Sequence, residues 1–246
     1  MSRYANWGVS TMADTARSGR FFEIMGWIFL ALVIAGFGTL QVVSPELTSP
    51  MRPTLLVHIV LFLAWYALLI VQPRLIAARD IQTHMKVGKA SIALAFAMVG
   101  IGFVVIREAY LKPGWSIAGM SPQASVMFPF TDMIFFPLAY GLAIYNRGKA
   151  DAHKRFMLFA GMVMLDPALA RLVGGLGLPP PIIMAIELTL VASVIIYDRR
   201  TLGRVHPATW VGSAMIVLTY PAVFVLAQTQ GWSDFVTAMF GVAPTP

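Results

Sequence analysis

The chain has 246 residues, of which 58% are hydrophobic and only 12% are charged, and its mean hydropathy is +0.75. A soluble domain ordinarily carries about 25% charged residues, so this composition excludes an ordinary soluble fold and indicates a membrane protein. The formal net charge is +7, and the absence of cysteine excludes disulfides, thiolate metal sites and cysteine nucleophiles.

The first apolar segment runs from Phe21 to Val43 and follows a polar segment, residues 1–20. It is longer than the apolar region of a signal peptide, which has about 7–15 residues, and no small-residue cleavage pattern follows it. We therefore expect a retained first membrane helix.

Further along the chain, apolar segments long enough to cross a bilayer recur, since a spanning helix needs roughly 20 residues. The predicted spans two to seven are Leu55–Ile76, Val87–Ile106, Ala124–Tyr145, Asp151–Gly175, Pro181–Tyr197 and Ala208–Gln228. No long polar linker separates them. We therefore predict an all-α, polytopic membrane protein: a single seven-helix transmembrane domain over residues 1–246, with a tail at 229–246.

The distribution of basic residues predicts the orientation. All lysines and arginines except Arg52, Arg107, Lys112 and Arg171 fall on one side of this topology. Because cytoplasmic loops carry the excess of Lys and Arg, we predict a cytoplasmic N-terminal segment, an external C-terminal tail and an inner-membrane location. The net charge of +7 is then explained by the excess of Lys and Arg in the cytoplasmic loops. The expected partners are the lipid bilayer and membrane-protein subunits, with no nucleic acid.

Histidine and glutamine recur in a recognisable pattern. His58 and Gln72 share span two, an H-x-x-x-G motif starts at His84, and the sequence His-Lys-Arg-Phe-Met starts at His153. The pattern resembles a family of uncharacterised bacterial seven-helix integral membrane proteins, over spans two to five. At Met85 that family favours a basic residue. The resemblance implies the seven-helix fold and recurrent histidines, and it implies no established activity.

Ionisable side chains inside the predicted spans form the first candidate site. They are His58, Asp132, Asp166, Arg171 and Glu187. A charged group at bilayer depth costs about 2.5–3.5 kcal/mol on insertion scales, so we expect these side chains to face other helices. They would bind a ligand, proton or metal, or form an ion-pair network that only fixes helix packing. Arg171 is predicted to pair with Glu187 or Asp132.

The pair Asp166–Pro167 has a special consequence for the fifth span. Proline has no amide hydrogen, so Pro167 cannot donate to the carbonyl of Val163. A carboxyl group beside a free carbonyl could hold a proton, a cation or a polar ligand. Alternatively, Asp166 could stay protonated and serve packing alone.

Three histidines form the second candidate site. His84, His153 and His206 stand at the predicted cytoplasmic starts of spans three, five and seven. Three histidines can bind Zn or Fe, with carboxylates orienting them. The alternative is that these side chains are solvated or contact lipid head groups. A two-haem cytochrome is disfavoured, because His58 stands alone on the other side.

The remaining sequence signals leave three function classes. No nucleotide-binding, serine-hydrolase or zinc-protease motif is present, and no span carries a central lysine, which excludes a conventional retinal protein. The favoured function is an accessory or assembly subunit of a membrane complex, with a buried polar His/carboxylate site. The alternatives are a metal- or cofactor-binding membrane oxidoreductase and a proton-linked small-molecule transporter. The sequence names neither a cofactor nor a reaction.

Overall fold

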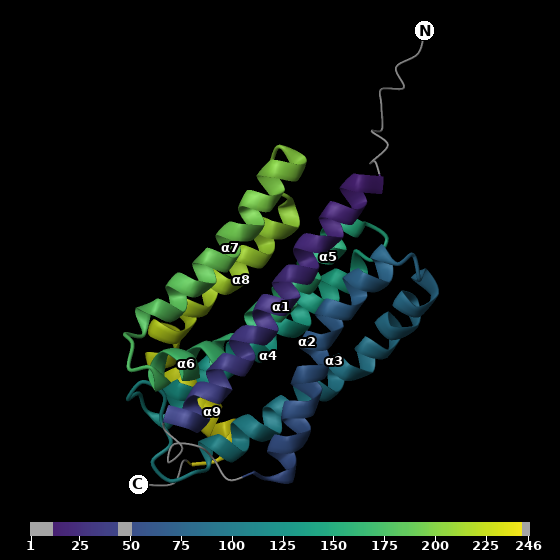
Figure 1. Ribbon diagram of the computed structural model, residues 1–246. Coiled ribbons are helices and arrows are strands. Elements are labelled where there is room, and N and C mark those ends of the chain that lie inside the picture. The colour runs from purple at the N-terminus through teal and green to yellow at the C-terminus, as the bar shows by residue number, and fades with distance from the viewer. Residues whose placement is uncertain (1–11, 44–50, 243–246) are drawn as a thin grey trace.

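The computed structural model describes residues 12–43 and 51–242, and this part of the chain is all-α (Figure 1). In chain order the helices are α1 (Met12–Val43), α2 (Pro53–Ala77), α3 (Ile81–Tyr110), α4 (Pro122–Tyr145), α5 (Ala150–Val163), α6 (Asp166–Gly175), α7 (Pro181–Leu202), α8 (Pro207–Phe224), the short 3-10 helix η2 (Leu226–Gln228) and α9 (Gln230–Phe240). Most of the polar N-terminal segment, the linker at 44–50 and the last residues of the tail lie outside the described residues.

Within the described ranges, six helices are long and apolar enough to cross a membrane, and the bent pair α5 and α6 gives a seventh span if counted as one. The predicted all-α polytopic membrane fold is therefore confirmed. The orientation across the membrane stays a prediction.

Local capping fixes where several helices begin. The Asp80 carboxylate accepts a 3.0 Å hydrogen bond from the amide of Thr83 at the start of α3. The Ser121 hydroxyl accepts from the amide of Ala124 at 3.2 Å at the start of α4. Each bond satisfies an amide that has no partner inside its own helix.

The fifth predicted span is broken. α5 ends at Val163 and α6 begins at Asp166, and the two helices meet at a bend of 43°. Pro167 lies in the first turn of α6, where a missing amide hydrogen costs nothing. The amide of Leu165 donates a hydrogen bond to the carbonyl of Met162 at 3.0 Å. The break therefore places Asp166 at the beginning of a helix inside the bundle.

Close approach of helices builds the core around this break. An added Cβ at Gly36 on α1 would lie 2.1 Å from the carbonyl oxygen of Ala168 on α6. An added Cβ at Gly212 on α8 would lie 2.1 Å from the ring of Phe159 on α5. Small residues at such positions let membrane helices pack at short distance.

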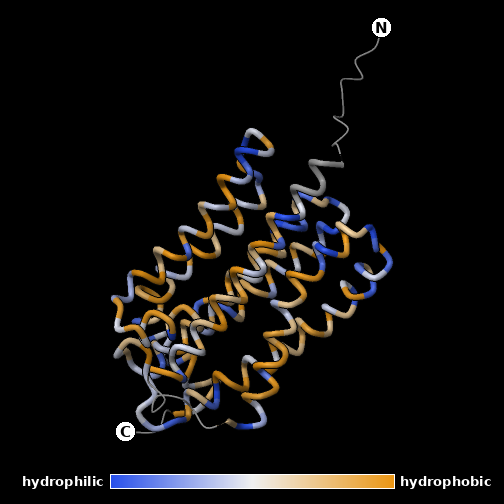
Figure 2. Tube along the Cα trace, in the orientation of Figure 1, coloured by the Kyte–Doolittle hydropathy of each residue, from blue (hydrophilic) through white to orange (hydrophobic). Residues whose placement is uncertain are grey.

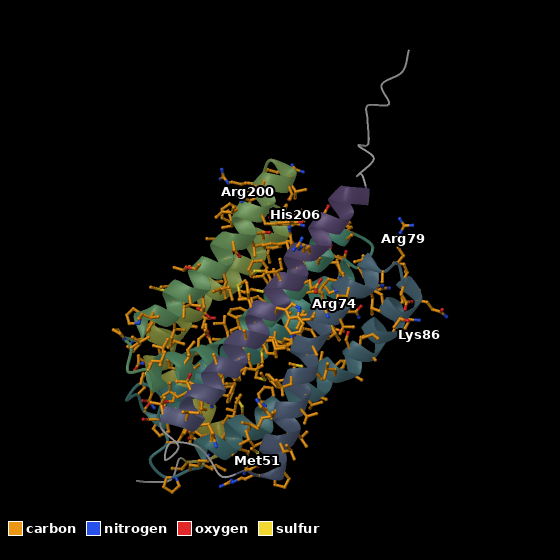
Figure 3. All side chains as sticks on the ribbon, viewed as in Figure 1. Met51, Arg74, Arg79, Lys86, Arg200 and His206 are labelled. Carbon is orange, nitrogen blue, oxygen red and sulfur yellow. The ribbon has the colours of Figure 1, made fainter. Side chains whose placement is uncertain are left out.

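The two ends of the bundle differ in polarity. Figure 2 shows apolar helix middles between hydrophilic ends. In Figure 3, Arg79, Lys86 and Arg200 are at the end where α1 begins, whereas Met51 is at the opposite end. We call the first of these the basic end. It corresponds to the side that the distribution of Lys and Arg predicts to be cytoplasmic.

Candidate functional site

Three carboxyl groups from three helices meet inside the bundle, and we call Asp132, Asp166 and Glu187 the carboxyl cluster. Asp132 on α4 and Glu187 on α7 are buried, with 2% and 3% of their surfaces exposed. The carboxyl groups of Asp166 and Glu187 lie close enough to act directly on each other, and Asp132 lies within electrostatic range of both. The structure thus brings together three of the five residues predicted for the first site.

Two tyrosines complete this cluster. The Tyr220 hydroxyl on α8 donates a hydrogen bond to Oε2 of Glu187. Tyr66 on α2 is 1% exposed, donates to the carbonyl of Gly161 at 3.3 Å, and lies within electrostatic range of Asp132 and Asp166. Neither residue is among those predicted from the sequence. A tyrosine deep within a span, away from the interfaces where Tyr usually sits, is the signal that could have identified them.

The carboxyl cluster has no cationic partner within the described part of the chain, where none of its oxygens forms an ion pair with Lys or Arg. Asp132 Oδ1 and Asp166 Oδ1 are buried and have no hydrogen-bond partner there. A hydrogen bond between two carboxyl groups requires a proton between them, because carboxylates only accept. A hydrogen bond between Asp166 and Glu187 would therefore need a proton on one of the two groups.

The predicted ion pair of Arg171 is wrong. Its Nη1 donates to the carbonyl of Pro167 at 2.6 Å, and its guanidinium lies 4.6 Å from the centre of the Phe37 ring. Arg171 follows Asp166 by five residues, which places the two on different faces of a helix with 3.6 residues per turn. Because Asp166 faces Glu187, Arg171 points away from the carboxyl cluster.

His58 also lies apart from the carboxyl cluster. Its ring stacks on Phe62 with 4.0 Å between ring centres, and its buried Nδ1 has no hydrogen-bond partner among the described residues. The charge of Arg171 acts on it. The five predicted residues therefore divide into the carboxyl cluster and a separate pair, His58 and Arg171.

A buried ion pair, missed by the sequence analysis, lies at the basic end. Arg155 on α5 and Asp198 on α7 are both 0% exposed. Arg155 Nε donates to Asp198 Oδ1 at 2.8 Å, and its Nη2 donates to the same oxygen. Asp198 Oδ2 accepts from the backbone amide of His206 at 2.9 Å and from the Thr209 hydroxyl at 2.5 Å. These bonds connect α5, α7 and α8.

The three histidines of the second predicted site have different neighbours. His153 Nδ1 lies 2.8 Å from the carbonyl oxygen of Ala143, and His84 is within electrostatic range of His153. His206 instead accepts from the amide of Ala208 at 3.0 Å, beside the Arg155–Asp198 pair. Burial and the charge of Arg155 lower the pKa of His206.

Metal binding by these histidines stays a prediction. In the described ranges, no three His, Asp or Glu side chains are arranged so that they could together hold a metal ion. This holds for the three carboxyl groups of the carboxyl cluster as well. Proton binding, which needs only the contact between two carboxyl groups, fits the cluster better than metal binding.

Two open cavities lie outside the carboxyl cluster. One, of about 520 Å³, lies between the first turns of α5 and α8, where Lys149 and His206 are among its lining residues. The other, of about 440 Å³, lies between α4 and α9 and is largely apolar, with Phe130 and Trp232 in its wall. Neither is lined by a residue of the cluster.

The fold and this site define a polytopic α-helical membrane protein with a carboxyl cluster inside its bundle, which has no ion-pair partner among the described residues. No protein-family model, no curated protein and no solved structure matches the chain.

Proposed function

We propose that this protein is an inner-membrane, proton-linked transporter of a small solute, in which the carboxyl cluster binds and releases the coupled proton. The observation that carries this proposal is the close approach of the Asp166 and Glu187 carboxyl groups inside the bundle, without a cationic partner in the described residues. Ionisable groups at membrane depth that face the interior of a bundle commonly serve proton relays.

The helix break supports coupling of the proton to a conformational change. Discontinuous helices supply the binding sites of many transporters, near the middle of the membrane. Here Asp166 begins α6, Glu187 belongs to α7 and its partner Tyr220 belongs to α8. Removing the shared proton would replace an attraction between α6 and α7 by repulsion between two carboxylates. Protonation would thereby change how these helices pack.

The other two function classes stay predictions with distinct outcomes. An accessory or assembly subunit would co-purify in fixed stoichiometry with other membrane subunits. A metal- or cofactor-binding oxidoreductase would carry a bound metal or a visible absorption band after purification. We favour the transporter because the carboxyl cluster offers a specific site for the coupled proton.

Proton flux into proteoliposomes tests the proposal. We would enclose pyranine, set the membrane potential with potassium and valinomycin, and record flux with and without a panel of sugars, amino acids and organic acids. We expect a solute-stimulated flux in the wild type, lost in Asp166→Asn and Glu187→Gln. The matched control is Asp234→Asn, which alters an exposed carboxylate on α9. Equal flux in all four proteins would refute the role of the cluster.

A further inference from the structure

Buried polar atoms without a hydrogen-bond partner extend from the basic end of the bundle to the carboxyl cluster. Besides His58 Nδ1, which lies apart from the carboxyl cluster, the atoms of this kind in the described residues are Trp65 Nε1, Gln72 Oε1, His84 Nδ1, Asp132 Oδ1 and Asp166 Oδ1. A buried unsatisfied polar atom costs roughly 1–3 kcal/mol, so several of them in one region call for a shared explanation. Internal water is the usual one, since a buried water makes about three hydrogen bonds to such groups.

The series begins where α2, α3 and α5 approach one another at the basic end. Gln72 Nε2 donates to the backbone carbonyl of His84 at 3.3 Å, which leaves Gln72 Oε1 without a partner. His84 Nδ1 is also without one, and the charge of His153 acts on His84. If His153 Nδ1 donates to the carbonyl of Ala143, at 2.8 Å, its Nε2 remains an acceptor. These side chains offer both donors and acceptors to water.

The middle of the series is a hydroxyl pair between α3 and α4. Ser91 lies seven residues after His84, which keeps both on nearly the same face of α3. The Ser91 hydroxyl donates to the carbonyl of Gly88 at 2.7 Å and lies 2.8 Å from the Tyr140 hydroxyl. Because the single hydrogen of Ser91 is already used, Tyr140 is the donor between them. Both residues are buried, with 3% and 7% exposed.

Trp65 on α2 packs beside this pair, on the side of α4 that leads to Asp132. Its ring contacts those of Tyr140 and Phe136 edge-on, at 5.4 and 4.8 Å between ring centres. Asp132 lies one helical turn from Phe136 on α4, and positions four apart share a helix face. On α2, Trp65 and Gln72 are seven residues apart and so also lie on one face. The facing surfaces of α2, α3 and α4 therefore present polar groups from the basic end to Asp132.

We infer that these surfaces enclose a file of internal water molecules that conducts protons between the basic end and the carboxyl cluster, with Gln72, His84 and His153 at its entrance. A proton enters at the imidazoles, passes between waters beside the Ser91–Tyr140 pair, and reaches Asp132. Each transfer moves one proton along a hydrogen bond and leaves no net change in the relay groups. This inference rests on the proposed function, because it names the route by which the proton reaches that site.

Infrared spectroscopy of the protein in nanodiscs tests the route. After rapid transfer to D₂O, the carbonyl-stretch band of protonated carboxyl groups shifts at the rate at which solvent protons reach the cluster. We expect this shift to slow by about fivefold in Tyr140→Phe, which removes one hydroxyl, because each lost hydrogen bond raises the barrier by about 1 kcal/mol. Ser91→Ala is the second variant, should Tyr140→Phe fold poorly.

Ser213→Ala is the matched control, because Ser213 is also a buried serine that donates to a helix carbonyl, at 2.7 Å on α8. Its exchange should match that of the wild type. Equal exchange rates in folded Tyr140→Phe, Ser91→Ala and wild-type protein would overturn the route. If the spectra of Asp166→Asn and Glu187→Gln keep every protonated-carboxyl band of the wild type, the proton site itself is overturned. The failure of the route and the failure of the proposed function are therefore distinguishable.

Discussion

Arg155 and Asp198 form an ion pair in which both side chains are fully buried, joining α5 to α7 at the basic end of the bundle. Breaking a buried pair by removing one partner costs about 3–5 kcal/mol, because the other charge is left without compensation. We expect Arg155→Met to lower the free energy of unfolding by that amount, measured by denaturant titration in detergent.

The control for this pair is Arg74→Met. Arg74 pairs with Glu23 at 2.6 Å, but 55% of the Arg74 side chain is exposed, and exposed pairs contribute about 0–1 kcal/mol. The double variant Arg155→Met, Asp198→Leu should recover only part of the loss, because the amide of His206 and the hydroxyl of Thr209 still lose their acceptor. Similar losses for Arg155→Met and Arg74→Met would contradict the buried pairing.

Arg171 should show no energetic coupling to Glu187. Its guanidinium contacts the Pro167 carbonyl and the Phe37 ring, and distant sites add to within about 0.3–0.5 kcal/mol in double-mutant cycles. The cycle of Arg171→Leu with Glu187→Gln should therefore be additive in unfolding free energy. The cycle of Arg171→Leu with Phe37→Leu should show coupling of about 0.5–2 kcal/mol from the cation–π contact. Coupling of Arg171 to Glu187, together with additivity of Arg171 and Phe37, would instead support the ion pair predicted from the sequence.

Two glycines of α1 should respond oppositely to alanine. At Gly36 an added Cβ would lie 2.1 Å from the backbone of Ala168, and overpacking of this kind costs typically about 1–3 kcal/mol. At Gly38 an added Cβ has nothing within 4 Å, so alanine should gain up to about 1 kcal/mol of helix propensity. Thermal unfolding of Gly36→Ala and Gly38→Ala in the same detergent checks the contrast. Equal effects would mean that α1 and α6 are not in close contact.

Protonation of His206 should destabilise the fold. Burial, and then the charge of Arg155, lower its pKa below the ordinary 6.5, although Asp198 and Asp151 oppose this and Arg204 adds to it. The unfolded chain therefore binds more protons at this residue, and stability falls as the pH drops below 6.5. His206→Asn keeps a capping acceptor but cannot titrate, so its unfolding free energy should fall less between about pH 7 and pH 5. Parallel pH profiles for the two proteins would exclude His206 as the source.

Hydrophobic length predicted the membrane fold well, because spanning helices need only a long apolar segment. Contacts between side chains were harder to predict. Arg155 stands among basic residues that are typical of a cytoplasmic loop, and its burial depends on Asp198, 43 residues away along the chain. Likewise, the approach of Tyr220 to Glu187 depends on how α7 and α8 pack, which neither helix encodes alone.

The sequence did identify Asp132, Asp166 and Glu187 as carboxyl groups that turn into the bundle, because ionisable residues within an apolar segment are conspicuous. It also identified the missing hydrogen bond at Pro167. It did not reveal that the helix would break there and turn Arg171 away from Glu187. That outcome follows from the three-dimensional direction of α6, for which the sequence pattern of a single straight span gives no information.

The break at Pro167 should determine whether Asp166 can reach Glu187. Pro167→Ala restores an amide that can donate to the carbonyl of Val163, which favours one continuous helix through the 43° bend. We expect slower amide hydrogen exchange at residues 163–168, measured by mass spectrometry, together with loss of the proton flux that depends on Asp166. Pro221→Ala, which removes another proline from a helix interior, should leave exchange at 163–168 unchanged. Unaltered exchange and flux in Pro167→Ala would show that packing against α1, through Gly36, holds the bend without the proline.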